Sequence, residues 1–377
     1  MATQGSAGHG RSSRLGARER NIVSTPHMGD YWIPIKTLGE LLNCEVMVPP
    51  PMTRRTLELG TKHSPEFVCL PFKYNLGNYL ESLEKGATLL VQAGGGCRFG
   101  YYGEVQEAIL RDLGYDFDFL RLSGNTNIRE FYRDFKAVNP SLTWRKAAAA
   151  FRVAIAQTRA LDEIDDFIRK RVGFQAEDGA MEAIKKRFMR EIDALRDVKA
   201  VRAVHARTLE ELAAVPVNMP EDRLRVGVVG ELYVLMEPFS NYFVEKQLAK
   251  RGCEVHRFVT VSQMFDHSGR KRHQRHIREM LDYAAPYLKY HVGADGTESV
   301  GMTHKLMKDG FDGVLHIKPF GCMPEVNAMS ALQRLSRENT FPVLFISYDS
   351  QWSETGLQTR LDAFCDMLTM RKKRASA

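Results

Sequence analysis

Several common functional motifs are missing from this sequence, and each absence narrows what the chain can do. It contains no GxxxxGK[ST] loop and no GxGxxG fingerprint, so no motif supports the binding of ATP or NAD. It also contains no GxSxG elbow and no HExxH pair. No apolar run approaches the roughly 20 residues that a helix needs to span a bilayer, so we expect no membrane segment.

Cysteine is scarce and never closely paired. The 377 residues include 6 cysteines, and none of them forms a Cys-x-x-Cys pair. This spacing argues against a zinc ribbon and against a ferredoxin-type run of cluster ligands. Because disulfides are not expected in a cytosolic chain of this size, the thiols are metal ligands, reactive groups or core residues.

The first 20 residues and the overall charge indicate the compartment and the class of partner only broadly. Residues 1–20 are small, polar and basic without hydrophobic periodicity, which predicts a disordered tail. They lack the apolar core of a secretory signal, so we expect a cytoplasmic protein. The formal net charge is +7, but the basic residues are spread out and several lie near the ends of the chain. We therefore expect no nucleic-acid partner.

The length and the hydrophobic pattern predict two α/β domains. A chain of 377 residues exceeds the usual limit for a single core. Apolar runs alternate with helical patterns in both halves, which predicts two doubly wound, Rossmann-like (flavodoxin-like) domains with parallel sheets. The predicted strands are 21–23, 44–48, 89–91, 116–122, 224–230, 254–259, 313–317 and 342–347. The predicted helices of these domains are 31–42, 52–62, 74–85, 104–113, 239–249, 270–288, 303–308, 325–335 and 356–370.

Between these two halves the amino-acid composition changes. From residue 128 to residue 214 glycine becomes rare and strong helix formers dominate, which predicts an all-helical segment. The predicted organisation is a tail (1–20), an N-terminal α/β domain (21–125), a helical segment with a linker (126–222) and a C-terminal α/β domain (223–377).

Three cysteines share one local setting. Cys69, Cys97 and Cys322 each follow a predicted strand, stand beside glycine or proline, and precede a predicted helix. The N-terminus of a helix stabilises a thiolate, and thiolates favour iron–sulfur clusters or zinc. We therefore predict one metal centre, most simply an iron–sulfur cluster whose three protein ligands leave one iron open. The alternative is that they are ordinary small residues in tight turns.

Residues around these turns suggest further roles. Glu231 follows a strong strand, at a place where open α/β sheets bind ligands. Both Glu231 and Glu325 are candidate proton-transfer carboxylates, and helix capping or surface charge is the alternative for each. Glycines allow a cluster to approach the backbone, and cations offset its negative charge. The residues predicted to contact the cofactor in these ways are Lys73, Gly95, Gly96, Arg98 and Lys318.

The remaining cysteines have a different setting. Cys44 begins a predicted strand, Cys253 precedes one, and Cys365 lies on the apolar face of a predicted helix. We expect all three to be core or near-core thiols.

Four segments resemble the 2-hydroxyacyl-CoA dehydratase/benzoyl-CoA reductase superfamily, and most closely its stand-alone branch called CoA protein activase. The resemblance extends over residues 21–370 and implies paired Rossmann-like domains. It also implies an iron–sulfur cluster held by three cysteines near a subunit interface, which here would be Cys69, Cys97 and Cys322. The segments are FVCLPFKYNLGNYLE (67–81), QAGGGCRFGYYGE (92–104), VGVVGELYVLMEPFSNYF (226–243) and HIKPFGCMPEV (316–326).

The resemblance also implies partners. Family dimers receive low-potential electrons from a separate ATP-hydrolysing activase of actin-like fold, whereas this chain carries no actin-like phosphate-binding motif. The implied protein is a homodimer, or one of two related subunits, that transfers electrons from a [4Fe–4S] or double-cubane cluster to an acyl-CoA or another small substrate. The alternatives are a non-catalytic electron carrier, or other cluster-bearing partner of an activase, and a metal-free α/β protein that has lost the chemistry.

Overall fold

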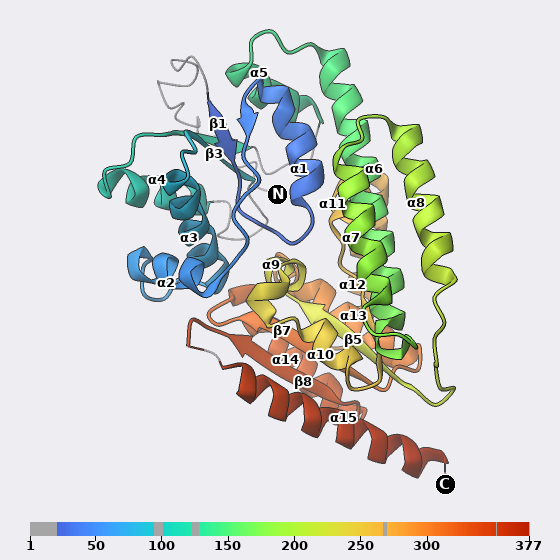
Figure 1. The fold of residues 1–377 in the computed structure, drawn as a ribbon. Helices are drawn as coiled ribbons and strands as arrows, with labels where there is room; N and C mark the ends of the chain where they lie inside the picture. Colours follow the sequence, from blue (N-terminus) through green and yellow to red (C-terminus); the bar gives the residue numbers. More distant parts are fainter. Residues whose placement is uncertain (1–20, 94–100, 123–127, 267–269, 352, 377) are drawn as a thin grey trace.

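The N-terminal half forms a small parallel sheet. The computed structural model describes residues 21–93, 101–122, 128–266, 270–351 and 353–376. The strands β1 (Ile22–Ser24), β2 (Glu45–Val46), β3 (Leu89–Ala93) and β4 (Asp118–Leu122) lie in the order β2-β1-β3-β4. All three pairings are parallel. Figure 1 shows this sheet among the helices α1 (Trp32–Gly39), α2 (Arg54–His63), α3 (Leu70–Glu84) and α4 (Tyr102–Asp112).

The C-terminal half repeats this plan. The strands β5 (Leu224–Gly230), β6 (Cys253–Arg257), β7 (Gly313–Pro319) and β8 (Val343–Tyr348) lie in the order β6-β5-β7-β8 and are also parallel. The central strand β7 is buried along its whole length, as expected for a parallel sheet that helices cover on both faces. The flavodoxin-like order of both sheets confirms the predicted α/β class. The helices of this half are α9 (Leu232–Met236), α10 (Val244–Ala249), α11 (Val261–Asp266), α12 (Arg270–Ala284), α13 (Gly296–Lys308), α14 (Met323–Glu338) and α15 (Glu354–Ser376).

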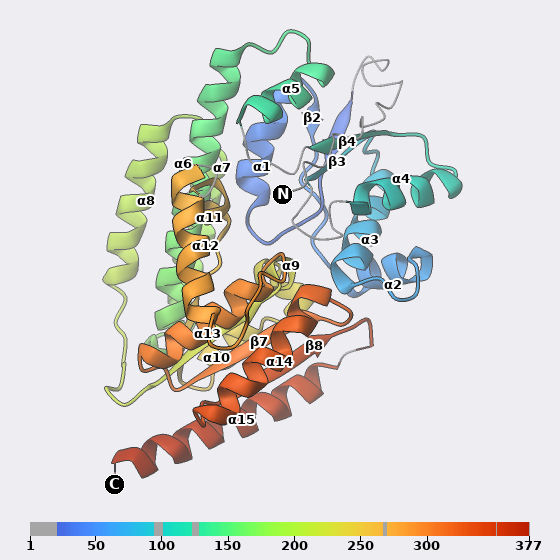
Figure 2. The same ribbon diagram turned by 180° about the vertical axis from the view of Figure 1, so that it is seen from behind.

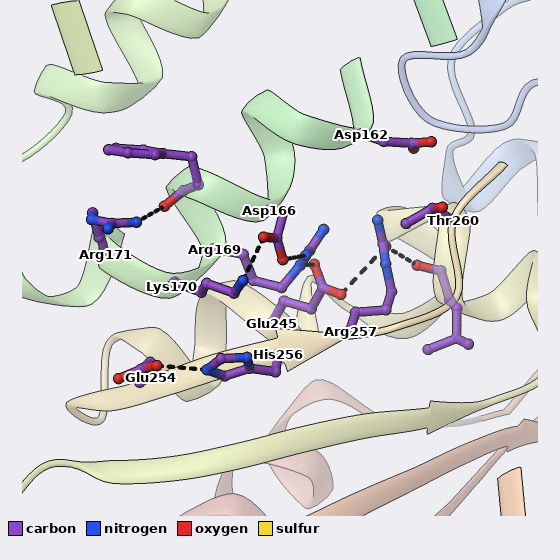
Figure 3. Close-up of polar contacts among 12 residues, drawn as sticks. Asp162, Asp166, Arg169, Lys170, Arg171, Glu245, Glu254, His256, Arg257 and Thr260 are labelled. Carbon is purple, nitrogen blue, oxygen red and sulfur yellow. Dashed lines mark hydrogen bonds and ion pairs between the residues drawn. The ribbon is translucent and has the colours of Figure 1, made fainter. Parts of the chain in front are cut away.

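A helical segment connects the two sheets and lies beside both of them (Figures 1 and 2). It contains α5 (Ile128–Val138), the long helix α6 (Trp144–Arg171), α7 (Ala180–Asp193) and α8 (Val198–Ala213). Its all-helical character agrees with the prediction, and the domain boundaries themselves stay a prediction. Ion pairs attach α6 to the second sheet: Arg169 binds Glu245 at 2.9 Å, and Arg257 on β6 binds the same carboxylate at 3.3 Å (Figure 3).

The carboxyl ends of the two sheets face each other. His27, just after β1, places its ring Nδ1 2.7 Å from the carboxylate of Glu237, which follows β5 and α9. The hydroxyl of Tyr233 donates to the carbonyl oxygen of His27 at 3.2 Å. In the same region Tyr74 of α3 packs edge-on against Phe239, with ring centroids 6.2 Å apart. Because parallel α/β sheets bind ligands at their carboxyl ends, this interface is where a site is expected.

One predicted helix is wrong. The pattern predicted an unbroken helix over 239–249, but the chain forms a short 3-10 turn (Pro238–Asn241) and then α10. Tyr242 and Phe243 between them are left-handed, with φ of 56° and 55°. The side chain of Asn241 explains the break, because it accepts from the backbone N–H of Val244 and donates to the carbonyl of Val234.

Within the described ranges, no helix is both long and apolar enough to cross a bilayer.

Candidate functional site

Two of the three predicted thiols, one in each α/β half, stand directly before the start of a helix. Cys69 is the residue before α3, and Cys322 is the residue before α14; both have extended backbones, with φ of −68° and −70°. Each helix carries a proline in its first turn, where the missing N–H costs nothing. The unpaired N–H groups of a helix start favour a negative charge on a neighbouring sulfur.

The strand predicted before Cys69 is not formed. A bend and a turn occupy residues 64–67 between α2 and α3, so this thiol follows a helix and not a strand. The sequence Phe67-Val68 has the residue types of a strand, but the following Pro71 sits at the helix start and the helix begins at Leu70. Cys322, in contrast, follows β7 as predicted.

The loops that carry these two thiols meet between the sheets. A Cβ placed on Gly321 would lie 3.7 Å from the carbonyl oxygen of Phe67. Gly321 has a φ of +76°, a conformation that favours glycine, and this turn places Cys322 at the end of β7. The two sulfurs are close enough for the charge of Cys69 to contribute to the raised pKa of Cys322. Cys69 also lies 3.0 Å from the hydroxyl of Tyr102.

The surroundings of Cys322 are mostly anionic. Burial raises the pKa of its thiol, and the charge of Glu231 raises it further, while a backbone N–H bond from Glu325 lowers it. The ammonium group of Lys318 is the compensating cation: its side chain is only 4% exposed. Burial lowers the pKa of Lys318, and the nearby Cys322 and Glu325 oppose that shift.

A group of acidic side chains lies next to these thiols. Glu231 accepts from the backbone N–H groups of Tyr233 and Val234, so it caps α9, which was the alternative to a role in proton transfer. Burial raises its pKa to about 7, and the charge of Glu325 adds to the shift. Burial also raises the pKa of Glu298 to about 7.

Asp295 belongs to the same acidic group. Its carboxylate accepts from the backbone N–H of Leu232 at 3.1 Å, which connects the start of α13 to the start of α9. The pKa of Asp295 is raised well above its ordinary value. Burial is the largest cause, and the negative charges of Glu231, Glu325 and Glu298 raise it further. Burial and neighbouring negative charges both favour the protonated form of a carboxyl group.

Glu325 is the most enclosed member of this group. It is 0% exposed, accepts from Ser299 at 3.2 Å, and lies 2.6 Å from Nε2 of His316 on β7. His316 is also 0% exposed, and its other ring nitrogen, Nδ1, has no hydrogen-bond partner among the residues that the structure describes. The pair therefore forms a buried, directional contact beneath the Cys322 loop.

The other predicted site residues are placed as follows. Lys73 is half-buried in the first turns of α3, four positions after Cys69. Gly95, Gly96, Cys97 and Arg98 lie outside the described residues. Among the residues that are described, no group of three or more His, Cys, Asp or Glu side chains is arranged to hold a metal ion.

Sequence reasoning missed two members of the acidic group. Asp295 and Glu298 stand at the start of α13, and their spacing of three is a common helix-start pattern that carries no functional signal by itself. Tyr102 was also overlooked, although it stands within the quoted glycine-rich segment. Only the fold brings these residues to the carboxyl ends of the strands.

Comparison with known families supports the relationship that the four segments suggested. The sequence model of the 2-hydroxyglutaryl-CoA dehydratase D-component matches residues 125–368. The match includes the second sheet, Glu231 and Cys322, and it begins after Cys69 and Cys97. A comparison with curated proteins finds no significant match. Because the match spans more than half of the chain, the protein belongs to the 2-hydroxyglutaryl-CoA dehydratase D-component family, within the 2-hydroxyacyl-CoA dehydratase superfamily.

Proposed function

We propose that this chain is an iron–sulfur redox protein that transfers low-potential electrons to an acyl-CoA or another small substrate. One observation carries the proposal: a thiol from each half of the molecule stands at a helix start, and the two thiol loops touch where the sheets face each other. A three-cysteine site shared by two domains requires this meeting. The family relationship gives the substrate class, since the matching description is of an acyl-CoA dehydratase component.

The residues present fit such a cofactor. Cys69 and Cys322 would be two of its ligands, and Cys97, outside the described residues, would be the third. A [4Fe–4S] cluster, or a double cubane, would supply one-electron transfer at low potential. The buried ammonium of Lys318 beside Cys322 would offset the charge of the thiolates. The half-buried Lys73 on the turn after Cys69 would act in the same way from the other loop.

The acidic side chains would bind and release protons next to the electron-transfer site. Glu231 is held by two backbone N–H groups, and its pKa of about 7 lets it gain or lose a proton near neutral pH. It is the carboxylate we assign to proton exchange with a substrate. Glu325 is enclosed completely and bonded to His316, so we assign it a positioning role for that histidine and for the Cys322 loop.

Exposed apolar side chains around the thiol loops support a partner at this face. Phe67 is 86% exposed and Phe320 is 63% exposed, and each stands two residues before one of the cysteines. Met323 and Val326 on α14 are about half exposed. Apolar side chains gathered in this way favour a protein contact. We propose that a second copy or a related subunit covers this face, that a separate ATP-hydrolysing activase delivers the electrons, and that the assembly is cytoplasmic.

The test is the metal content of protein purified without air. We expect wild-type protein to be brown and to contain iron and acid-labile sulfide. Cys69→Ala and Cys322→Ala remove a proposed ligand, so bound iron should fall by more than about tenfold. Cys44→Ala changes the thiol directly before β2, at the amino end of the first sheet, and is the matched control that should keep its iron.

A wild-type preparation reconstituted with iron and sulfide that stays colourless and iron-free would exclude this function and favour the metal-free alternative. An iron-containing protein that shows no turnover with acyl-CoA substrates, even in the presence of an activase, would be the non-catalytic electron carrier. Light scattering on the same samples gives the mass of the assembly.

A further inference from the structure

A second pair of thiols lies in the core of the C-terminal half, separate from the proposed cluster site. Cys253 begins β6, and Cys365 lies on α15, the helix that runs along the outside of the second sheet (Figure 1). Their sulfur atoms are 3.6 Å apart although the residues are 112 positions apart in sequence. Cys253 is 0% exposed and Cys365 is 7% exposed.

The two thiols are electronically different. The hydrogen bond between them lowers the pKa of Cys365, and the guanidinium of Arg251 lowers it further. The same hydrogen bond, together with burial, raises the pKa of Cys253. Arg251 is held near α15 by Asp362, whose carboxylate lies 2.7 Å from its Nε. Cys365 is the more exposed of the two sulfurs and lies on the helix that Arg251 contacts, so we take it as the sulfur that a peroxide reaches first.

We propose that Cys253 and Cys365 form a reversible redox pair that closes to a disulfide when the protein meets a peroxide. The Cys365 thiolate attacks one oxygen of hydrogen peroxide, which breaks the O–O bond and leaves a sulfenic acid and hydroxide. The Cys253 thiol then attacks that sulfur, and the sulfenic oxygen leaves as water. The hydroxide becomes water by taking the proton that Cys365 released on ionising, so in sum two thiols are oxidised, one peroxide is reduced, and two water molecules form. An external dithiol then reduces the disulfide back to the two thiols by thiol–disulfide exchange.

The geometry requires only a small movement. A disulfide bond is about 2.05 Å long, so the sulfurs must approach by about 1.5 Å. Cys365 lies on a helix and Cys253 at the first residue of a strand, so a small shift of α15 along the sheet supplies this distance. α15 packs on the sheet through Leu357, Leu361, Phe364 and Leu368, and ion pairs of Asp362 with Arg251 and of Lys372 with Asp312 hold it from the side.

The consequence of closure is a covalent tether between the C-terminal helix and the sheet. A cross-link that closes a loop of this length restricts the unfolded chain, so the oxidised protein should be the more stable form. This pair differs from the thiols at the carboxyl ends of the sheets, because it needs no metal and because Cys253 lies at the amino end of β6, beside Leu224 at the start of β5.

The test is peptide mapping of the full-length protein after a titration with hydrogen peroxide and blocking of remaining thiols with maleimide. Trypsin releases Cys253 in the peptide 252–257 and Cys365 in the peptide 361–371. We expect these two peptides to be joined, with the loss of two hydrogen atoms, and to separate after treatment with dithiothreitol. The melting temperature of the oxidised protein should rise by roughly 5–10 °C and return on reduction.

Cys253→Ala and Cys365→Ala should each abolish both the joined peptide and the rise in melting temperature, whereas Cys44→Ala should abolish neither. If these variants fail to fold, the peptide map of the wild-type protein still tests the proposal by itself. The proposal is overturned if both thiols are recovered as maleimide adducts after denaturation at a peroxide dose that oxidises Cys44. It is also overturned if Cys365 pairs with a thiol other than Cys253. Neither outcome depends on the presence of iron.

Discussion

At the scale of single residues, the buried carboxyl of Glu298 should make the stability of the fold depend on pH, with or without a cofactor. Its pKa is raised to about 7 by burial in the folded protein, whereas an unfolded glutamate releases its proton near pH 4.3. Folding therefore takes up a proton between these values, and the contribution of Glu298 to stability is lost as the pH rises through this window. Within the described part of the chain, one oxygen of Glu298 is buried without a hydrogen-bond partner, which adds to the cost of the charged form.

We predict that Glu298→Gln stabilises the protein at pH 8 by about 2 kcal/mol and has little effect at pH 4.5. Glutamine keeps the shape of the side chain and removes the buried charge. Urea unfolding of the variant and the wild type at several pH values measures the difference. Glu221→Gln changes an exposed carboxylate of the linker and should leave the pH profile of stability unchanged. A Glu298→Gln variant that parallels the wild type at every pH would contradict the assigned burial of this charge.

The residues of the site could be predicted from the sequence only in part. Cys322 and Lys318 were recognisable because glycine and proline mark the turn after a strong apolar strand. The contact between His316 and Glu325 was not, because the spacing of nine residues gives no periodic signal across a strand, a turn and a helix. The grouping of Glu231 with Asp295 depends on two helix starts that meet only in the folded sheet.

At the scale of elements, the crossing of α2 and α3 sets the position of the Cys69 loop. The two helices touch through glycine: a Cβ on Gly60 would lie 1.7 Å from the carbonyl oxygen of Lys73. A Cβ on Gly77 would lie 1.9 Å from the carbonyl oxygen of Thr56. Both clashes are with backbone atoms, so no side-chain rotation relieves them, and the helices must separate.

We predict that Gly77→Ala destabilises the protein by about 3 kcal/mol and also lowers iron binding, because the loop before α3 moves with the helix. Chemical denaturation measures the first effect and iron analysis the second. Gly356→Ala is the matched control. Gly356 lies near the start of α15, and of the described residues an added Cβ would meet Ser353 alone, with 3.3 Å to its Oγ, so this change should be neutral or slightly stabilising. Equal stability of the two variants would show that α2 and α3 do not pack this closely.

The elements were more predictable than the site. β5 was predicted at its observed bounds because residues 224–230, LRVGVVG, are apolar or glycine except for Arg225, and no proline interrupts them. β2 was predicted over 44–48 and is only two residues long, since the prolines after it cannot continue a ladder. The break between Asn241 and Val244 escaped prediction because it rests on a side-chain bond to Val234, seven residues earlier.

At the scale of the whole molecule, the sequence predicted two similar sheets but not how they face each other. That arrangement depends on contacts between residues more than 200 positions apart, such as Tyr233 with His27. No local pattern encodes such contacts, because each partner looks like an ordinary polar residue after a strand. The facing carboxyl ends are nevertheless what brings the loops of Cys69 and Cys322 together, so the candidate site is a property of the assembled halves.

Glu237 is the side chain that joins these halves most directly. It is 2% exposed, and one of its oxygens lies 2.7 Å from the His27 ring and accepts from the Gly29 backbone N–H at 2.8 Å. Its other oxygen accepts from the backbone of Phe239 at 3.1 Å. Removing the carboxylate would leave partly buried polar groups of both halves without this partner, and an unsatisfied buried group costs about 1–3 kcal/mol.

We predict that Glu237→Ala lowers stability by about 4 kcal/mol and separates thermal unfolding into two transitions, because the two sheets would no longer melt together. Glu237→Gln keeps one oxygen acceptor and should lose less than half as much. Scanning calorimetry gives the number of transitions, and hydrogen exchange shows which sheet opens first. Since the cysteines of the two loops must stay together to share a cofactor, Glu237→Ala should also bind less iron than Glu237→Gln. A variant that unfolds in one unchanged transition would mean that the halves are joined by the helical segment alone.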